Sequence, residues 1–306
     1  MPAFTNLDQV VAAAVKQGPF KVAVAAGQDA AALEALAMAE GENLATAVLV
    51  GEEALIAEAM GKLKKPLAKA EVVAAEGEEG AAKKAVELVK TGAAHMVLKG
   101  KLQTKALMKA VLDKETGLRT GRLLSDAFLC EFPSEIGERL LCIADGGINV
   151  APDAEQKAQI IINCVKVYHA LGIEKPRVAV LNAVETPIPD HQPSQDAVAL
   201  QKMWDEGKIP GCYLEGPLSL DLAVSMASVK KKGHASEVAG QADILLCPEI
   251  VCANVFAKST TYFCHWRLAH VTMGATAPVL IPSRADTAEA KFLSIALSAL
   301  CVGKTV

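Results

Sequence analysis

Aromatic side chains are scarce in this chain of 306 residues, at 4%, and no excess of basic residues accompanies them. The net charge of -4 provides no general attraction for polyanions, and single-stranded nucleic acid is usually held by stacking on aromatic rings. Nucleic acid is therefore not an expected partner. An anionic ligand would need basic residues gathered locally.

Long apolar runs are also missing. No stretch of about 18 residues is free of charged or turn-forming residues, so we expect no membrane-spanning helix. Residues 1–18 lack the basic segment followed by an apolar segment that is typical of a signal peptide. These absences predict a cytoplasmic protein.

Metal and nucleotide motifs are absent as well. The eight cysteines and six histidines form neither a CxxC pair nor an HExxH pattern. Cys142, Cys164 and Cys247 lie inside apolar segments, where buried, reduced thiols are the expected state. A Walker A loop and a GxGxxG fingerprint are both missing. We therefore expect no metal and no tightly bound cofactor.

Hydrophobic residues make up 52% of the chain, and they follow an alternating pattern. Short β-type runs alternate with longer helical patterns, which predicts an α/β fold with parallel strands and right-handed crossovers. Strands are expected at residues 21–25, 46–50, 72–74, 95–98, 123–132, 139–144, 177–182, 212–214, 244–247 and 277–281, and helices at 30–39, 52–60, 80–89, 104–112, 153–171, 194–205, 219–231, 251–266 and 288–302.

The alternation is interrupted between Gly117 and Asp145. Two strand-like runs follow each other there, at residues 123–132 and 139–144. They predict an antiparallel pair or a strand that crosses between domains. We place a domain boundary near Pro133.

A polar turn lies between the last expected strand and the last expected helix, for which Thr287 is a plausible N-cap. It contains Ser283, Arg284 and Asp286. In α/β proteins, ligands bind where strand carboxyl ends and helix N-termini meet. Arginine suits phosphate, serine can donate to an oxygen that becomes negative, and aspartate can take a proton. Solvated or capping residues are the alternative interpretation of this turn.

Two earlier turns carry basic residues. Lys99, Lys101 and Thr104 follow an expected strand, and the two lysines, the threonine hydroxyl and the exposed amides at the start of a helix would suit a phosphate or carbonyl oxygen. Arg119 and Arg122 flank Gly121, which lets an anion approach closely. An ordinary strand-to-helix turn and a surface turn are the respective alternatives.

Two further features have both a functional and a structural interpretation. Asp145 ends a buried strand beside two glycines, which fits either a ligand-facing carboxylate or a tight turn. Asn254 and Lys258 lie four residues apart on one face of an expected helix, which faces either a cleft or solvent.

Together these segments resemble the phosphate acetyl/butyryltransferase family over most of the chain, from about Met96 to Leu297, and the butyryl-type branch is the closer one. The resemblance is carried by Leu98-Lys99-Gly100 with Thr104, residues 117–121, Asp145 with residues 149–153, residues 171–176, 215–218, 237–240 and 243–246, Asn254 with Lys258, and residues 283–286.

The resemblance implies a reversible transfer of a short-chain acyl group, butyryl or acetyl, between coenzyme A (CoA) and inorganic phosphate. It also implies two three-layer α/β/α domains with a cleft between them, as in isocitrate and isopropylmalate dehydrogenases. The first domain would comprise residues 1–132 and 276–306, and the second residues 133–275. A homodimer or higher homo-oligomer is expected, with CoA as a substrate.

The resemblance also assigns roles to residues. Arg284 would bind phosphate and Ser283 would donate to the oxyanion, while a carboxylate would take the proton of the CoA thiol. The thiolate would then attack the acyl phosphate directly in a ternary complex. The residues expected to contact the substrates are Lys101, Thr104, Arg119, Asp145, Asn254 and Lys258.

The chain departs from the family pattern at several positions. Ala290 stands where acetyl-type relatives have the proposed base, which leaves Asp286 and Glu289, and we prefer Asp286 because it is nearer the turn. Ala253 replaces a usual glycine, and residues 185–193 and 264–266 are unusual. A CoA- or acyl-phosphate-binding relative without activity and a dehydrogenase of the same fold are the competing hypotheses.

Overall fold

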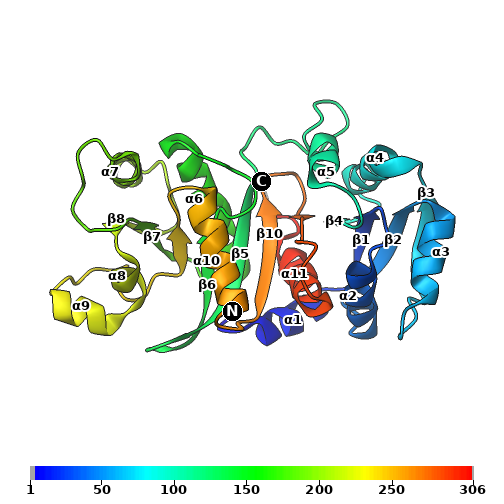
Figure 1. Ribbon diagram of the computed structural model, residues 1–306, viewed down its shortest axis with the longest axis horizontal. Coiled ribbons are helices and arrows are strands. Elements are labelled where there is room, and N and C mark those ends of the chain that lie inside the picture. The colour runs from blue at the N-terminus through cyan, green and yellow to red at the C-terminus, as the bar shows by residue number, and fades with distance from the viewer. Residues whose placement is uncertain (1–3, 305–306) are drawn as a thin grey trace. The chain divides into compact units, whose positions relative to one another are not determined.

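The computed structural model describes residues 4–304, and their contacts divide the chain into two compact units. The split unit joins Asp8–Arg122 to Ala269–Val306, and the middle unit joins Met1–Leu7 to Leu123–Leu268, in each case as far as these residues are described. Both units combine a sheet with helices, which confirms the predicted α/β class (Figure 1).

The unit boundaries differ in position from those expected near residues 133 and 276. Strand β5 (Ser125–Ser134) pairs with β6 (Gly137–Ala144) from Phe128 to Ser134, so the residues before Pro133 belong with the middle unit. At the other end, β10 (Leu268–Met273) pairs with β11 (Val279–Leu280) and therefore belongs mostly to the split unit.

The sheet of the split unit has the strand order β3-β2-β1-β4-β11-β10. Its strands are parallel except that β10 runs antiparallel to β11. The remaining elements of this unit are β1 (Phe20–Ala25), β2 (Ala45–Gly51), β3 (Glu71–Ala74), β4 (Met96–Lys99), α1 (Leu7–Val15), α2 (Ala30–Gly41), α3 (Glu53–Gly61), α4 (Gly77–Lys90), α5 (Thr104–Val111) and α11 (Ala288–Cys301).

Helix α11 is the most deeply buried helix of the split unit. Every residue from Ala290 to Cys301 is buried, and the helix packs against α2. The Thr287 side chain accepts a hydrogen bond from the Ala290 amide at 3.1 Å, which confirms the predicted N-cap. The predicted turn at residues 282–287 therefore lies between β11 and α11.

The sheet of the middle unit has the order β5-β6-β9-β7-β8. Strands β5 and β6 form the predicted antiparallel pair, and the other neighbours are parallel. The remaining elements are β7 (Arg177–Leu181), β8 (Tyr213–Leu218), β9 (Ile244–Leu246), α6 (Ala154–Ala170), α7 (Gln192–Asp205), α8 (Leu220–Val224), α9 (Met226–Lys232) and α10 (Ile250–Tyr262).

Two predicted helices of the middle unit differ from the structure. The helix expected at 219–231 is interrupted at Ser225, which adopts extended backbone angles and caps α9 through its hydroxyl. Glu135 accepts hydrogen bonds from the Ser225 hydroxyl and the Ala227 amide, which holds this break in place. The helix expected at 251–266 ends at Tyr262, and Trp266 instead packs against Phe132 beside the apolar core.

Two elements were not predicted. Helix α1 was missed, and so was β10, a completely buried strand that contains His270 and Thr272. Among residues 4–304, no helix is both long and apolar enough to span a membrane.

Candidate functional site

Strand β4 occupies the position in the split unit around which the candidate site is built. It lies between β1 and β11, with Ala25 of β1 opposite Lys99 and Leu280 of β11 opposite Leu98. The chain passes from β1 to β2 on one side, whereas β4 lies on the other side of β1. In such sheets, ligands bind beyond the strand carboxyl ends where the order reverses.

The turn after β11 is organised by the Asp286 carboxylate. Its Oδ2 accepts a hydrogen bond from the Ser283 amide at 2.7 Å and lies 3.3 Å from Nε2 of His270. The Ser283 hydroxyl accepts a bond from the Ala285 amide at 3.4 Å, which leaves its own proton available for donation. The turn thus presents a serine hydroxyl on a backbone held in place by a carboxylate.

The environment of Asp286 favours its ionised form. Burial raises its pKa, but the hydrogen bond and charge of His270, the Ser283 amide and the charge of Lys291 outweigh burial and bring the pKa below its ordinary value of 3.8. A carboxylate with a low pKa is a weak proton acceptor. Asp286 is thus well suited to hold the turn and less suited to take a proton from a thiol.

The other two positions considered for the base lie on the first turn of α11. Ala290 is buried, and its amide donates to Thr287. Glu289 is exposed in the same turn. The next side chain, Lys291, points into the protein and forms an ion pair with Asp29 at 3.0 Å.

Lys99, the last residue of β4, is a buried cation beside this turn. It is only 6% exposed, and the hydrogen bond found for its ammonium group within residues 4–304 is a long one, 3.5 Å to the Leu102 carbonyl. Burial lowers the pKa of Lys99, Lys291 and Arg284 lower it further, and Asp29 and Asp286 act in the opposite direction.

Arg284, Arg119 and Thr104 are exposed residues of the same unit. In the described part of the chain, no carboxylate lies within ion-pair distance of the Arg284 guanidinium, which leaves its fork of donors available. Arg119 pairs with Ala275 in an isolated antiparallel bridge just before β11. Thr104 begins α5, whose N-terminus has no side-chain cap.

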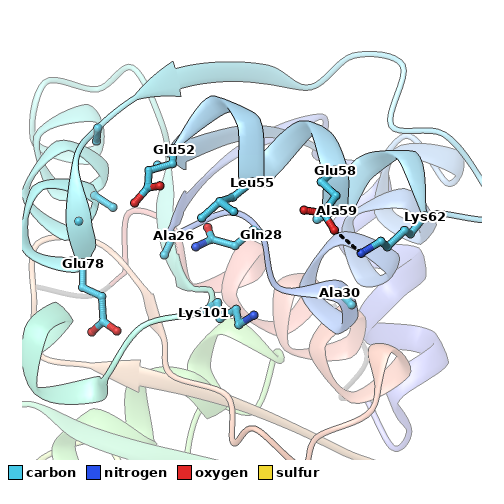
Figure 2. A pocket seen from close by; sticks show the side chains of 14 residues that line it. Ala26, Gln28, Ala30, Glu52, Leu55, Glu58, Ala59, Lys62, Glu78 and Lys101 are labelled. Atoms are coloured by element: carbon cyan, nitrogen blue, oxygen red, sulfur yellow. Dashed lines mark hydrogen bonds and ion pairs between the residues drawn. The ribbon is translucent and has the colours of Figure 1, made fainter.

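Lys101 lies on a separate feature, a cavity of about 490 Å³ at the carboxyl ends of β1, β2 and β3. In the view of Figure 2, Leu55, Gln28 and Lys101 lie between Glu52 and the ion pair of Glu58 with Lys62. The side-chain oxygen of Gln28 is buried and accepts no hydrogen bond from the residues that the structure describes. The cavity is of the size that small ligands occupy.

The remaining predicted residues lie in the middle unit, where Asp145 is buried at the end of β6. Its two oxygens accept four hydrogen bonds, from the amides of Gly147, Ile148 and Asn149 and from the Asn149 side chain. Burial and, to a lesser degree, the charge of Asp126 raise the pKa of Asp145 to about 6, although the hydrogen bonds from Gly147 and Asn149 lower it.

Asn254 is joined to the Asp145 loop. Its side chain donates to the Gly146 carbonyl at 2.8 Å, and Gly146 packs closely on the backbone of Ala253 and Asn254. Ala253 is fully buried in this contact. Lys258, one turn further along α10, is exposed. The structure thus brings Asn254 together with Asp145.

The predicted site residues therefore fall into two sets, with Ser283, Arg284, Asp286, Lys101, Thr104 and Arg119 on the split unit and Asp145, Asn254 and Lys258 on the middle unit. The sequence did not single out Asp29, His270 or Lys291. The three lie on different elements, and no spacing in the sequence connects them. A polar residue inside an apolar strand, as at His270, was the one signal that could have been followed.

Comparison with known proteins identifies the fold and the family. A 4-hydroxythreonine-4-phosphate dehydrogenase from Klebsiella pneumoniae is 12% identical and shares the fold, with a TM-score of 0.54 over 92% of this chain and 98% of that one. A branched-chain phosphotransacylase from Enterococcus faecalis V583 is 29% identical, with a TM-score of 0.82 over 92% of this chain and 99% of that one. The predicted dehydrogenase-like fold is confirmed.

The family is shown by sequence similarity. The family model described as "Phosphate acetyl/butaryl transferase" matches residues 78–299. A phosphate butyryltransferase from Clostridium acetobutylicum is 44% identical over 283 residues, which cover 92% of this chain and 93% of that protein. The chain belongs to the phosphate acetyl/butyryltransferase family, and it is therefore an acyltransferase.

The raised pKa of Asp145 predicts a titration that can be measured. Replacing the neighbour in Asp126→Asn removes a like charge, so the pKa of Asp145 is expected to fall from about 6 towards 3.8. Carboxyl ¹³C NMR of selectively labelled protein follows this titration. The matched change Asp205→Asn, at the exposed end of α7, should leave it unchanged.

The same shift fixes the sign of a stability effect. Between pH 3.8 and about 6 the folded protein keeps a proton that the unfolded chain has lost, so this group makes folding less favourable as the pH rises through that window. Above it, the ionised carboxylate costs about 3 kcal/mol. An Asp145 pKa near 3.8 in the unmodified protein would contradict this account.

Proposed function

We propose that the protein transfers a short-chain acyl group reversibly between CoA and inorganic phosphate by direct attack of the CoA thiolate in a ternary complex. The observation that carries this proposal is the turn after β11, in which Arg284 has a free fork of donors and Ser283 has a free hydroxyl proton beside the buried Lys99. A site that holds both substrates makes the transfer effectively unimolecular.

The residues of the turn fit the charges that develop in this reaction. Arg284 would bind two phosphate oxygens, because its planar donors match them. Ser283 would donate to the carbonyl oxygen as it becomes negative in the tetrahedral intermediate. Asp286 would keep both in place, since it binds the Ser283 amide and is itself fixed by His270.

CoA would extend from this turn into the cavity that Lys101 lines. A cavity of about 490 Å³ with apolar walls and unpaired polar groups suits part of a large substrate. Thr104, Arg119, Asp145, Asn254 and Lys258 stay proposed contacts on the strength of the family resemblance. The base that takes the thiol proton is proposed to be Asp286 or Glu289, and the low pKa of Asp286 favours Glu289.

The activity is tested by incubating the protein with phosphate and acyl-CoA substrates of increasing length. We expect free thiol to be released from acetyl-, butyryl- or branched-chain acyl-CoA, and the turnover numbers will rank the acyl groups. Absence of turnover with all of them would reject the proposal, and CoA binding without turnover would then indicate a non-catalytic relative.

The role of Arg284 is tested by Arg284→Ala. Loss of one preorganised donor is expected to lower kcat/KM by about 100-fold or more. Lys109→Ala is the control, since Lys109 is an exposed basic residue of the same unit that pairs with Glu79 at 2.9 Å and has no proposed contact. Activity of Arg284→Ala close to that of the parent protein would refute the assigned role.

Assembly into a homo-oligomer is also proposed. Val251, Val255, Tyr262 and Phe263 are exposed apolar residues in or directly after α10, with 62%, 63%, 56% and 83% of their surface accessible. Exposed apolar patches of this kind mark interaction surfaces. Sedimentation equilibrium should find a dimer or larger species, with dissociation in Val255→Asp. A monomer at micromolar concentration would contradict this.

A further inference from the structure

We infer that Lys99 is a phosphate ligand of this enzyme and shares the phosphate with Arg284. The inference rests on the proposed reaction, and it gives a specific role to a lysine that the sequence placed only in a turn suited to phosphate. It follows from the arrangement of five charged groups at the ends of β1, β4 and β11 in the split unit.

Cationic side chains outnumber carboxylates at the ends of these strands. Three cationic side chains, Lys99, Lys291 and Arg284, face two carboxylates, Asp29 and Asp286. Asp29 pairs with Lys291 at 3.0 Å, and Asp286 is held by His270 and the Ser283 amide. Within residues 4–304, no carboxylate is left at ion-pair distance from Lys99 or Arg284.

The burial of Lys99 makes this imbalance costly. A buried ammonium group with one long hydrogen bond loses its hydration without a full replacement. Lys99 and Arg284 are the two cations without a paired carboxylate, and an anion with several oxygens can accept hydrogen bonds from both. Inorganic phosphate is present as a mixture of monoanion and dianion near neutral pH, and it is a substrate of the proposed reaction.

The position of Lys99 is fixed by the backbone rather than by a flexible loop. Lys99 ends β4 in register with Ala25, and the next residue, Gly100, donates to the Ala25 carbonyl at 2.9 Å. A Cβ on Gly100 would come within 2.1 Å of the Ala26 carbonyl oxygen, so this approach requires glycine. The ammonium group is thereby kept near the turn that carries Arg284.

Phosphate binding should therefore be coupled to protonation of Lys99. Burial, Lys291 and Arg284 lower the pKa of the free side chain, and an adjacent dianion raises it again. At a pH near the pKa of free Lys99, binding should take up protons, and phosphate affinity should fall as the pH rises through that pKa. The ionisation of phosphate itself is common to all variants and cancels in their comparison.

The test measures binding of inorganic phosphate by calorimetry in two buffers of different ionisation enthalpy. We expect Lys99→Met to weaken phosphate binding by about 10- to 100-fold, the scale of a charge-assisted hydrogen bond, and to remove part of the proton uptake. Lys99→Arg keeps the charge, so it should retain most of the affinity while losing that proton uptake. Lys109→Met, an exposed lysine paired with Glu79 at 2.9 Å, is the matched control and should behave as the parent.

Steady-state kinetics distinguishes a role of Lys99 in phosphate binding from a role in acyl-CoA binding. Lys99→Met should raise KM for phosphate by at least tenfold and change KM for acyl-CoA by less than about threefold. Lys101→Met should instead raise KM for acyl-CoA and change KM for phosphate little, since Lys101 lines the cavity proposed for CoA.

Thermal unfolding provides a check on folding. Without phosphate, Lys99→Met should unfold no earlier than the parent, because no ion pair is lost. With phosphate, the rise in unfolding temperature should be smaller in the variant.

Equal phosphate affinity in Lys99→Met and the parent would overturn the inference, as would a fall in kcat alone. Because the binding assay needs no acyl-CoA, it remains decisive even if acyl transfer is not observed.

Discussion

The close approach of Gly100 to the backbone of Ala26 is the contact on which the candidate site depends. It allows the loop after β4 to pack against the loop after β1, with the amides of Gly100 and Lys101 donating to the carbonyls of Ala25 and Ala26 at 2.9 Å. Any side chain at this position would push the two loops apart. The separation of these loops sets where Lys99 and Asp29 lie, and β11 on the other side of β4 sets where the polar turn lies.

The charged groups at the end of β4 show how a fold can leave cationic side chains unpaired for a ligand. An ion pair between Lys291 and Asp29 and a contact between His270 and Asp286 satisfy four groups internally. Lys99, which is buried, and Arg284, which is exposed, remain without such partners in the described residues, so an excess of positive charge gathers at the end of β4. Stability and affinity are thus coupled, because an anion that neutralises this charge also removes a cost of burial.

Much of the fold could be predicted from the sequence, because alternating strand and helix patterns are local. The antiparallel pair at β5 and β6 and the Thr287 cap followed from residues close together in the chain. The break at Ser225 is held by Glu135, which is distant in the sequence, and β10 is recognised as a strand through its pairing with β11. Neither feature could be predicted from residues close together in the chain. The turns that contain Ser283, Arg284 and Lys99 were recognisable as motifs, whereas the roles of Asp29 and His270 become visible only from their tertiary neighbours.

The split unit consists of two separated stretches of chain, and this has a consequence for how the protein is made. Residues 8–122 emerge from the ribosome before residues 123–268 of the middle unit, and β11, the polar turn and α11 follow only after these. Helix α11 is almost wholly buried and packs against α2. Until α11 has been synthesised, the apolar face that residues 8–122 present to it therefore remains exposed. The long loop that this closure requires favours slow folding of the split unit. The turn proposed to bind phosphate would thus be among the last parts of the chain to reach its place in the fold.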